Sequence, residues 1–244
     1  MKSNGIGMCL LLLLVCTWSY AQTLTIAISG DNPPFNSRID QHNHFYGFDV
    51  ELMDEICKRM EADCRYMAMS LSDMFVAIEN NVVDLAIDSI IITSSRSQYY
   101  LFSQPYLNSQ VRFMVRKNSS YQLPDDLKGK IIGMRKSNPF REFLMQFFKT
   151  DIKLRTFKLK SDVIEALSDG EIDAILVNNT AAEYWASNDS NHFRLLGKPL
   201  PFGNGFGIMA NKDQAALISK INTILQQMKK DGFYKSIYTH YFSW

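Results

Sequence analysis

The sequence has few cysteines and no excess of charge of either sign. It contains four cysteines in 244 residues, and 26 basic residues are balanced by 25 acidic ones. A chain without a cluster of basic residues lacks the positively charged surface that attracts nucleic acid, so we expect no nucleic-acid partner. The four histidines show no metal-binding spacing, and there is no dinucleotide fingerprint or nucleophile elbow. We therefore expect no metal and no cofactor.

A long hydrophobic run is missing as well. Met1-Lys2 precedes a leucine-rich stretch from Cys9 to Val15, which is much shorter than the ~20 residues that span a bilayer. Ser19-Tyr20-Ala21 then offers small residues at both positions that a signal peptidase reads. These features predict a secretory signal over residues 1–21, cleaved before Gln22.

Two cysteines remain after that cleavage. Cys9 and Cys16 lie in the predicted signal, which leaves Cys57 and Cys64. An even pair in an oxidising compartment favours a disulfide, and the alternative is two buried free thiols. On the entropic model, such a short loop contributes only ~2–3 kcal/mol to stability.

Runs typical of strands alternate with amphipathic helical patterns along the chain, which indicates open parallel sheets. One helix is predicted to start at Asp49, a good N-cap residue, and another at Ser72. The apolar positions on one face of the first helix are Val50, Met53, Cys57 and Met60.

One pattern occurs twice. Residues 77–87 and 166–176 both read as a helix, a left-handed cap (Asn81 or Gly170), an aspartate and a buried strand. Two matching units imply two similar lobes. Because helix–turn–strand units are common, coincidence is the alternative.

Polar residues follow the last strand of each unit. Asp88-Ser89 follows the first and Asn178-Asn179 the second. Ligands of open α/β sheets bind beyond the carboxyl ends of the strands. We therefore expect these pairs to face each other across a cleft.

Short motifs in a specific order extend from Leu24 to the C-terminus. They are Pro34-Phe35, residues 47–52, Asp84-Leu-Ala-Ile, residues 92–96, Phe102-Ser-x-Pro-Tyr106, residues 127–133, Gly170-x-Ile-Asp-Ala174, residues 206–208 and Asp231-Gly232. In these motifs the chain resembles the bacterial extracellular solute-binding proteins of family 3, the amino-acid-binding group. The Cys57 and Cys64 pair particularly resembles the lysine/arginine/ornithine-binding proteins.

The resemblance implies an α/β, two-lobed periplasmic binding protein-like fold of type II, in which two open, mostly parallel sheets are joined by a two-strand hinge. Lobe one would comprise residues 22–109 plus 206–244, and lobe two residues 110–205. The hinge strands would lie near residues 108–111 and 205–208. The implied protein is the periplasmic solute-binding component of an ABC-type uptake system, which closes on a small ligand and docks on an inner-membrane ABC permease.

The resemblance also implies a set of ligand-binding residues. Arg96 matches the family arginine that clamps the ligand's α-carboxylate, and a guanidinium suits a carboxylate because it donates bidentately. The alternative for Arg96 is an ordinary surface arginine. The other predicted ligand-binding residues are Asp88, Ser89, Ile91, Asn32, Leu71, Arg135, Asn138 and Asn178.

Several of these positions depart from the family pattern. Asn178 is neutral where an acid usually binds the ligand's ammonium, and Ile91 replaces a serine. Pro139 lacks the N–H that the family supplies to the carboxylate. Asn32 and Leu71 replace two aromatic residues that sandwich the ligand side chain, which argues against a lysine- or arginine-like ligand.

The sequence therefore allows two interpretations of the ligand's identity. Either Asp88 binds the ammonium of an amino acid, which we favour, or Arg96 and Arg135 bind an organic anion with more than one acidic group. Asp88 has a third possible role, a salt bridge to Arg96 or Lys136 that shapes the site.

An enzyme on the same scaffold, resembling cyclohexadienyl dehydratase, is a further alternative. Such an enzyme needs a general acid or base in the cleft, and Asp88 is the one candidate. Because Asp88 lies beside two arginines, it should stay ionised. We expect binding without catalysis.

Overall fold

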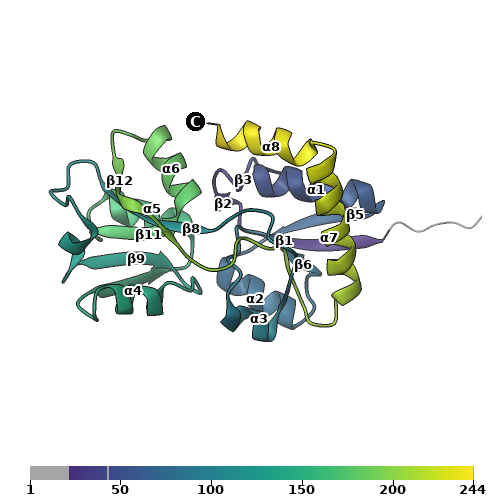
Figure 1. The fold of residues 1–244 in the computed structure, drawn as a ribbon, viewed down its shortest axis with the longest axis horizontal. Coiled ribbons are helices and arrows are strands. Elements are labelled where there is room, and N and C mark those ends of the chain that lie inside the picture. The colour runs from purple at the N-terminus through teal and green to yellow at the C-terminus, as the bar shows by residue number, and fades with distance from the viewer. Residues whose placement is uncertain (1–21, 43, 244) are drawn as a thin grey trace, which may run out of the picture.

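The computed structural model describes residues 22–42 and 44–243, which form two halves, each built on a five-stranded sheet (Figure 1). The predicted signal over residues 1–21 lies outside the described residues, so it stays a prediction. The α/β fold with two sheets joined by two connections is confirmed.

The first sheet has the strand order β5-β1-β6-β13-β7. Its strands are β1 (Thr23–Ile28), β5 (Asp63–Ala68), β6 (Leu85–Ala86), β7 (Leu101–Phe102) and β13 (Met209–Ala210). The helices of this half are α1 (Phe48–Met60), α2 (Leu71–Glu79), α3 (Ser94–Tyr99), α7 (Ala215–Lys230) and α8 (Phe233–Phe242). A small sheet of β2 (Asp31–Asn32), β3 (Asn36–Arg38) and β4 (Phe45–Tyr46) lies beside them. Helices α1 and α8 lie on one side of the first sheet, and α2 and α3 lie on the other (Figure 1).

The second sheet has the strand order β10-β9-β11-β8-β12. Its strands are β8 (Gln110–Arg116), β9 (Ile131–Arg135), β10 (Lys153–Phe157), β11 (Ala174–Asn178) and β12 (Phe193–Pro201). The helices of this half are the short η1 (Pro124–Leu127), α4 (Arg141–Phe147), α5 (Lys160–Ser168) and α6 (Asn179–Asn188).

Both sheets are mixed. Strand β1 pairs in parallel with β5 and β6, and β9 pairs in parallel with β10 and β11. The pairings of β13 in the first sheet and of β8 in the second are antiparallel, because these strands follow the connections between the halves. Each sheet is thus parallel in its first part and antiparallel where the chain crosses.

The repeated helix–turn–strand unit is a structural repeat. Asn81 and Gly170 both have left-handed backbones, with φ of 52° and 80°, as the sequence predicts. Asp84 accepts a hydrogen bond from a backbone N–H of β1 at 2.7 Å, and Asp173 accepts one from β9 at 2.9 Å. In both halves, the aspartate therefore fixes its strand against the parallel neighbour.

The predicted N-cap at Asp49 is wrong. Helix α1 has Gly47 as its N-cap residue, and Asp49 lies inside the first turn, fully buried. Its carboxylate accepts the Ser89 N–H at 2.9 Å and the Tyr106 hydroxyl at 3.0 Å. Asp49 thus joins α1 to the loop after β6 instead of capping its own helix.

Helices α2 and α3 each begin with a side-chain N-cap. Helix α2 begins at Leu71, one residue before the predicted Ser72, because Ser70 caps it by accepting an N–H at 3.3 Å. Thr93 caps α3 by accepting the N–H of Arg96 at 3.2 Å. This cap fixes the backbone of Arg96 in the first turn of α3.

The predicted disulfide is confirmed. Cys57 on α1 and Cys64 on β5 are bonded, with 6.1 Å between their Cα atoms. The bond connects the end of a helix to the strand that follows it.

Two chain segments connect the halves and pair with each other (Figure 1). The Phe206 N–H donates to the Leu107 carbonyl at 2.8 Å, and the Tyr106 N–H donates to the Phe206 carbonyl at 2.9 Å. The Gly205 N–H donates to Ser109 Oγ at 2.9 Å. The connection is therefore a two-stranded antiparallel ribbon, which we call the connecting ribbon (residues 106–109 and 205–206).

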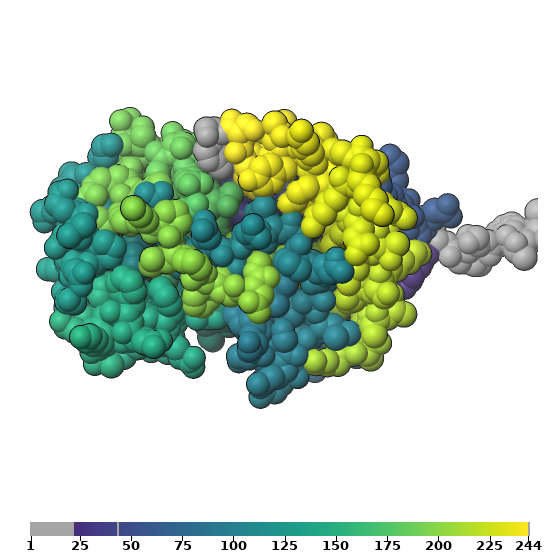
Figure 2. Space-filling model, in the orientation of Figure 1, coloured from purple at the N-terminus to yellow at the C-terminus, as the bar shows by residue number. Residues whose placement is uncertain are grey.

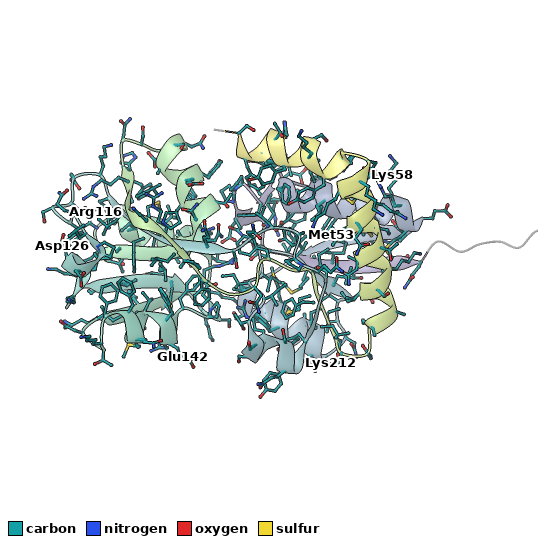
Figure 3. The ribbon with its side chains drawn as sticks, in the orientation of Figure 1. Met53, Lys58, Arg116, Asp126, Glu142 and Lys212 are labelled. Atoms are coloured by element: carbon teal, nitrogen blue, oxygen red, sulfur yellow. A yellow bond between two sulfur atoms is a disulfide. The ribbon has the colours of Figure 1, made fainter. Side chains whose placement is uncertain are left out.

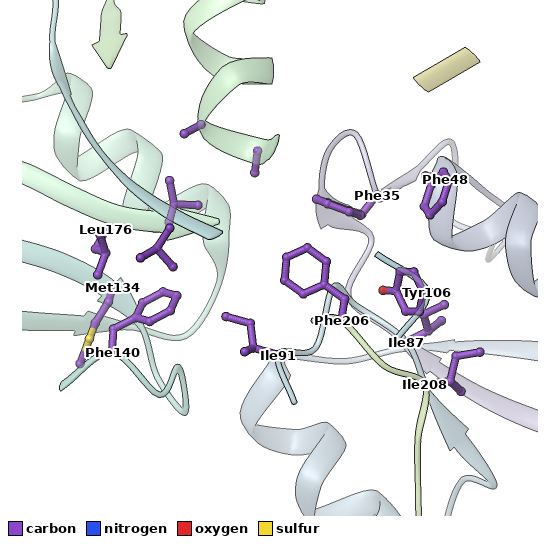
Figure 4. Packing of buried hydrophobic residues seen from close by; sticks show 14 of the residues in the cluster. Phe35, Phe48, Ile87, Ile91, Tyr106, Met134, Phe140, Leu176, Phe206 and Ile208 are labelled. Atoms are coloured by element: carbon purple, nitrogen blue, oxygen red, sulfur yellow. The ribbon is translucent and has the colours of Figure 1, made fainter. Parts of the chain in front are cut away.

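One apolar cluster extends through both halves. Figure 3 shows Met53 inside the first half, whereas Lys58 and Lys212 point outward from it. Figure 4 shows Phe206 beside Phe35 near the connecting ribbon, with ring centroids 5.6 Å apart. Met134, Phe140 and Leu176 pack in the second half, and Ile91 lies between the two groups (Figure 4).

Candidate functional site

A small cavity lies where the two sheets face each other. Its volume is about 30 Å³. Residues from both halves line it: Leu71, Asp88, Ser89, Ile90, Ile91 and Arg96 from the first, and Met134, Arg135, Asn138, Phe140, Lys160, Val163, Ile164 and residues 175–178 from the second. An amino acid is larger than this space, so the halves must separate or side chains must move before one can bind.

The structure brings all nine predicted ligand-binding residues together. Eight of them line the cavity, namely Leu71, Asp88, Ser89, Ile91, Arg96, Arg135, Asn138 and Asn178. The ninth, Asn32, lies directly behind the wall and donates to Asp88 Oδ1 at 3.0 Å and to Ser89 Oγ at 2.9 Å. Asp88, Ser89, Arg135 and Asn178 lie at or just after the carboxyl ends of strands, as expected for open α/β sheets, whereas Arg96 lies in α3.

Asp88 forms an ion pair with Arg135 at 2.8 Å. The third possible role of Asp88, a salt bridge, is therefore present, but its partner is Arg135 instead of Arg96 or Lys136. Arg135 is the last residue of β9, which ends opposite the end of β6. The other oxygen of Asp88 accepts hydrogen bonds from Ser29, Asn32 and Asn36. Burial alone would raise the pKa of Asp88, but Arg135 and these hydrogen bonds outweigh it and leave the pKa below its ordinary value. Asp88 is ionised, as predicted.

Arg96 is buried, with 8% of its surface exposed, so it is not an ordinary surface arginine. Its Nη1 donates to the Ile91 carbonyl and its Nη2 to the Ser137 carbonyl, each at 2.7 Å. Its guanidinium lies 4.9 Å from the ring centre of Phe75. Burial, and then the like charge of Arg135, lowers the pKa of Arg96 to about 10, so the side chain remains charged at neutral pH.

Sequence reasoning missed Lys160. This residue begins α5, lines the cavity and is 5% exposed. Its ammonium donates to Asn32 Oδ1, across the boundary between the halves. Burial, and then the charge of Arg135, lowers the pKa of Lys160 to about 7. Its position just after β10, at the carboxyl end of a strand, is the one sequence signal for a role in the site.

Asn178 has two hydrogen-bonding partners at the site. Its Oδ1 accepts the Ala181 N–H at 2.8 Å and caps α6, while its Nδ2 donates to Ser89 Oγ at 3.4 Å. The neutral residue therefore connects the ends of β11 and β6 across the boundary.

Two general findings concern residues 22–42 and 44–243. Within them, no cluster of three or more histidine, cysteine, aspartate or glutamate residues could hold a metal ion. No helix in the same ranges is long and apolar enough to cross a membrane.

The class of protein follows from comparison with known families. Residues 24–243 match the family of bacterial extracellular solute-binding proteins, family 3, and the chain belongs to this family. The resemblance seen in the short motifs is thereby confirmed.

Individual relatives are similar over almost their whole length. The crystal structure of an arginine 3rd transport system periplasmic binding protein from Legionella pneumophila has a TM-score of 0.86 and 38% identity, covering 91% of this chain and 100% of that one. The ABC transporter arginine-binding protein 1 of Escherichia coli (strain K12) is 29% identical over 228 residues, 92% of each chain. The lysine/arginine/ornithine-binding periplasmic protein of the same strain is 28% identical over 254 residues, covering 99% of this chain and 97% of that one.

Proposed function

We propose that this protein is the periplasmic solute-binding component of an ABC-type uptake system and that its ligand is an amino acid. The observation that carries the proposal is the buried, charged guanidinium of Arg96 at a cavity between two halves that a connecting ribbon joins. The names of the relatives, which are binding proteins for amino acids, support it.

We propose that residues 22–109 plus 206–244 move as one lobe and residues 110–205 as the other. The distribution of the strands supports this division, since β8 to β12 all belong to the second sheet. Rotation about the connecting ribbon would open the cavity and let a ligand enter, a hinge motion of a known kind. The ligand's contacts with both lobes would then stabilise the closed form.

In the bound state, the ligand's α-carboxylate would replace the Ser137 carbonyl as a partner of Arg96. The exchange is favourable because an ionised acceptor forms a stronger hydrogen bond with a guanidinium than a neutral carbonyl does. The ligand's ammonium would bind Asp88 after Arg135 has moved off that carboxylate. Ser89 and Asn138 would complete the polar wall.

We further propose that residues 1–21 are removed during export and that the closed form docks on an inner-membrane permease. The family and the periplasmic relatives support this location. We also propose that the ligand leaves unchanged. Asp88 cannot act as a general acid because it is ionised and its oxygens are already engaged.

A binding screen with amino acids tests the proposal. A ligand with Kd near 1 μM, added at 1 mM, stabilises the folded protein by about 4 kcal/mol, which raises the melting temperature clearly. The ligand recovered afterwards should have an unaltered proton NMR spectrum. If no amino acid raises the melting temperature, the proposed ligand class is wrong.

Arg96→Met should weaken binding of the amino acid that the screen selects by roughly 10- to 100-fold, the equivalent of one charged hydrogen bond. The matched control is Arg141→Met, which removes an exposed arginine on α4. Isothermal titration calorimetry on both variants gives the comparison. Equal affinities would remove Arg96 from the site.

A further inference from the structure

Buried cations outnumber the carboxylates around the cavity. Arg96, Arg135 and Lys160 line it, and each is at most 8% exposed. Two carboxylates contact them or their backbone: Asp88 pairs with Arg135, and Asp31 accepts the Lys160 N–H at 2.7 Å. With Lys160 protonated, the formal charge of this group is therefore one positive unit. Because the pKa of Lys160 is about 7, a ligand carboxylate beside it would favour that protonated state.

A third carboxylate does not correct the imbalance. Asp49 lies behind Ser89, and its oxygens accept hydrogen bonds from Ser89 and Tyr106 instead of contacting the three cations. Burial, and then the negative charge of Asp88, raises its pKa to about 7. Its charge is thus only partly present at neutral pH.

The carboxylate that lines the cavity has little capacity left for another cation. Asp88 already accepts from Arg135 and from three neutral donors. Asp31 does not line the cavity: its Oδ2 accepts the first two N–H groups of α5, at 2.7 and 3.4 Å, and its Oδ1 is buried without a hydrogen-bond partner among the described residues. A positively charged ligand side chain would add to the excess of positive charge around the cavity. Its binding would be weak, because an unpaired buried charge is strongly unfavourable.

We propose that the cavity selects a ligand with two carboxylates, one bound by Arg96 and the other between Arg135 and Lys160, which makes Lys160 a specificity-determining residue. This inference rests on the proposed function, since it assumes that the ligand binds in this cavity. The second carboxylate takes the place of Asn32 Oδ1 on Lys160 and draws Arg135 away from Asp88. Asp88 then becomes free to accept the ligand's ammonium.

The charge sum favours an acidic amino acid among such ligands. When Lys160 is protonated and Asp49 is neutral, the site has one excess positive charge, and L-glutamate or L-aspartate brings the total to zero. L-Glutamine leaves it at one and L-arginine raises it to two, whereas a dicarboxylate without an ammonium, such as glutarate, overshoots to minus one. The site should therefore differ in preference from relatives that are named as arginine-binding.

Isothermal titration calorimetry at pH 7 with these five compounds tests the inference on the mature protein. We expect L-glutamate or L-aspartate to bind at least about tenfold more tightly than L-glutamine, the size of one charged hydrogen bond. We expect L-arginine to bind most weakly among the amino acids.

Lys160→Met keeps the length of the side chain and removes its charge. It should weaken the binding of the preferred acidic amino acid by roughly 10- to 100-fold and leave L-glutamine binding unchanged or stronger. A purely structural role of Lys160 would weaken both ligands alike. The matched control is Lys153→Met, on the exposed start of β10 in the same half, which should behave as the wild type.

The outcomes separate this inference from the proposed function. Tighter binding of L-glutamine or L-arginine overturns the two-carboxylate preference and leaves the amino-acid proposal intact. Binding of glutarate alone supports the two-carboxylate site and overturns the amino-acid ligand. If none of the five compounds binds, the inference is wrong.

Discussion

Asp88 and Lys160 are two buried charges whose surroundings satisfy them to different degrees. Asp88 has an ion pair and several hydrogen bonds, which together keep its pKa below the ordinary value despite burial. Within the described part of the chain, the Lys160 ammonium has one hydrogen-bond partner, Asn32, and its pKa falls to about 7. The charge on Lys160 is therefore the one that a ligand can stabilise most.

This difference predicts how stability depends on pH. Below pH 7 the folded state carries the unfavourable lysine charge in full. Between pH 7 and the ordinary lysine pKa, the unfolded chain binds the proton and the folded one does not, so folding becomes more favourable as the pH rises. Relative to Lys160→Met, the wild type should gain about 2 kcal/mol of unfolding free energy from pH 7 to pH 9.

Urea unfolding of both proteins at several pH values, without ligand, measures this change. The charged groups that face Lys160, namely Arg135, Asp88, Asp31 and Asp49, are present in both proteins. Their own titration contributes to both curves, which is why the difference is the quantity to follow. A difference independent of pH would show that Lys160 keeps an ordinary pKa in the folded state.

Among secondary-structure elements, those with a local signal were predictable from the sequence. The repeated unit was recognised because Asn81 and Gly170 tolerate a left-handed backbone and an aspartate follows each of them. The first turn of α1 was not predictable, because the partners of Asp49 lie 40 and 57 residues away. Aspartate favours the N-cap position, but the contacts of Asp49 with these distant residues place it inside the first turn instead.

The same limit applies to the site. Of the residues identified at strand ends, Asp88, Ser89 and Asn178 line the cavity and Asn179 does not. The residues that the family resemblance added lie at the cavity or directly behind it. The sequence did not identify which residue pairs with which. Asp88 and Arg135 are 47 residues apart and belong to different sheets. Lys160 and Asn32 are 128 residues apart, so only the approach of the two halves reveals that contact.

Gly205 in the connecting ribbon is expected to be irreplaceable. Its φ is 94°, and a Cβ atom there would lie 2.5 Å from Pro105 Cβ and 2.8 Å from the Leu107 carbonyl oxygen. Gly205→Ala should lower the free energy of unfolding by roughly 3 kcal/mol, since it combines backbone strain with overpacking.

Gly232→Ala is the matched control for this prediction. Gly232 also has a positive φ, 87°, but an added Cβ would have nothing within 4 Å. It should cost only the backbone strain, about 1 kcal/mol. Chemical denaturation of both variants measures the difference, and equal losses would show that the crowding at Gly205 is relieved by a shift of the ribbon.

In the whole molecule, the two halves meet through polar contacts as well as through the connecting ribbon. Figure 2 shows them in contact, with a notch where they meet at the lower edge of this view. The polar contacts across the boundary include Arg135 with Asp88, Arg96 with the Ser137 carbonyl, Lys160 with Asn32, Asn178 with Ser89, Asp31 with the start of α5, and Lys158 with Asp73. Ligand binding must replace some of these contacts and can leave others in place.

Asp31 makes a contact that a ligand leaves in place, because it binds backbone N–H groups outside the cavity. It acts as an N-cap for a helix of the other half, and losing such a cap costs about 1 kcal/mol. Asp31→Ala should therefore shift the protein toward an open form and weaken ligand binding by roughly fivefold.

Small-angle X-ray scattering should show a larger radius of gyration for Asp31→Ala at a ligand concentration that closes the wild type. The control is Asp162→Ala, since Asp162 accepts the Leu159 N–H at 3.4 Å within its own half. Both variants lose a carboxylate at the start of α5. If Asp162→Ala opens the molecule as much as Asp31→Ala does, the contact across the boundary is not what matters.

The position of β13 also affects how the newly made chain folds. This strand pairs with both β6 and β7, yet it comes from residues 209–210, after the whole second sheet has been made. The second half is continuous in sequence and can form as soon as its last residue is available. The first half has to wait for the final segment of the chain. A polypeptide that emerges N-terminus first therefore keeps its leading part incomplete until the end of synthesis.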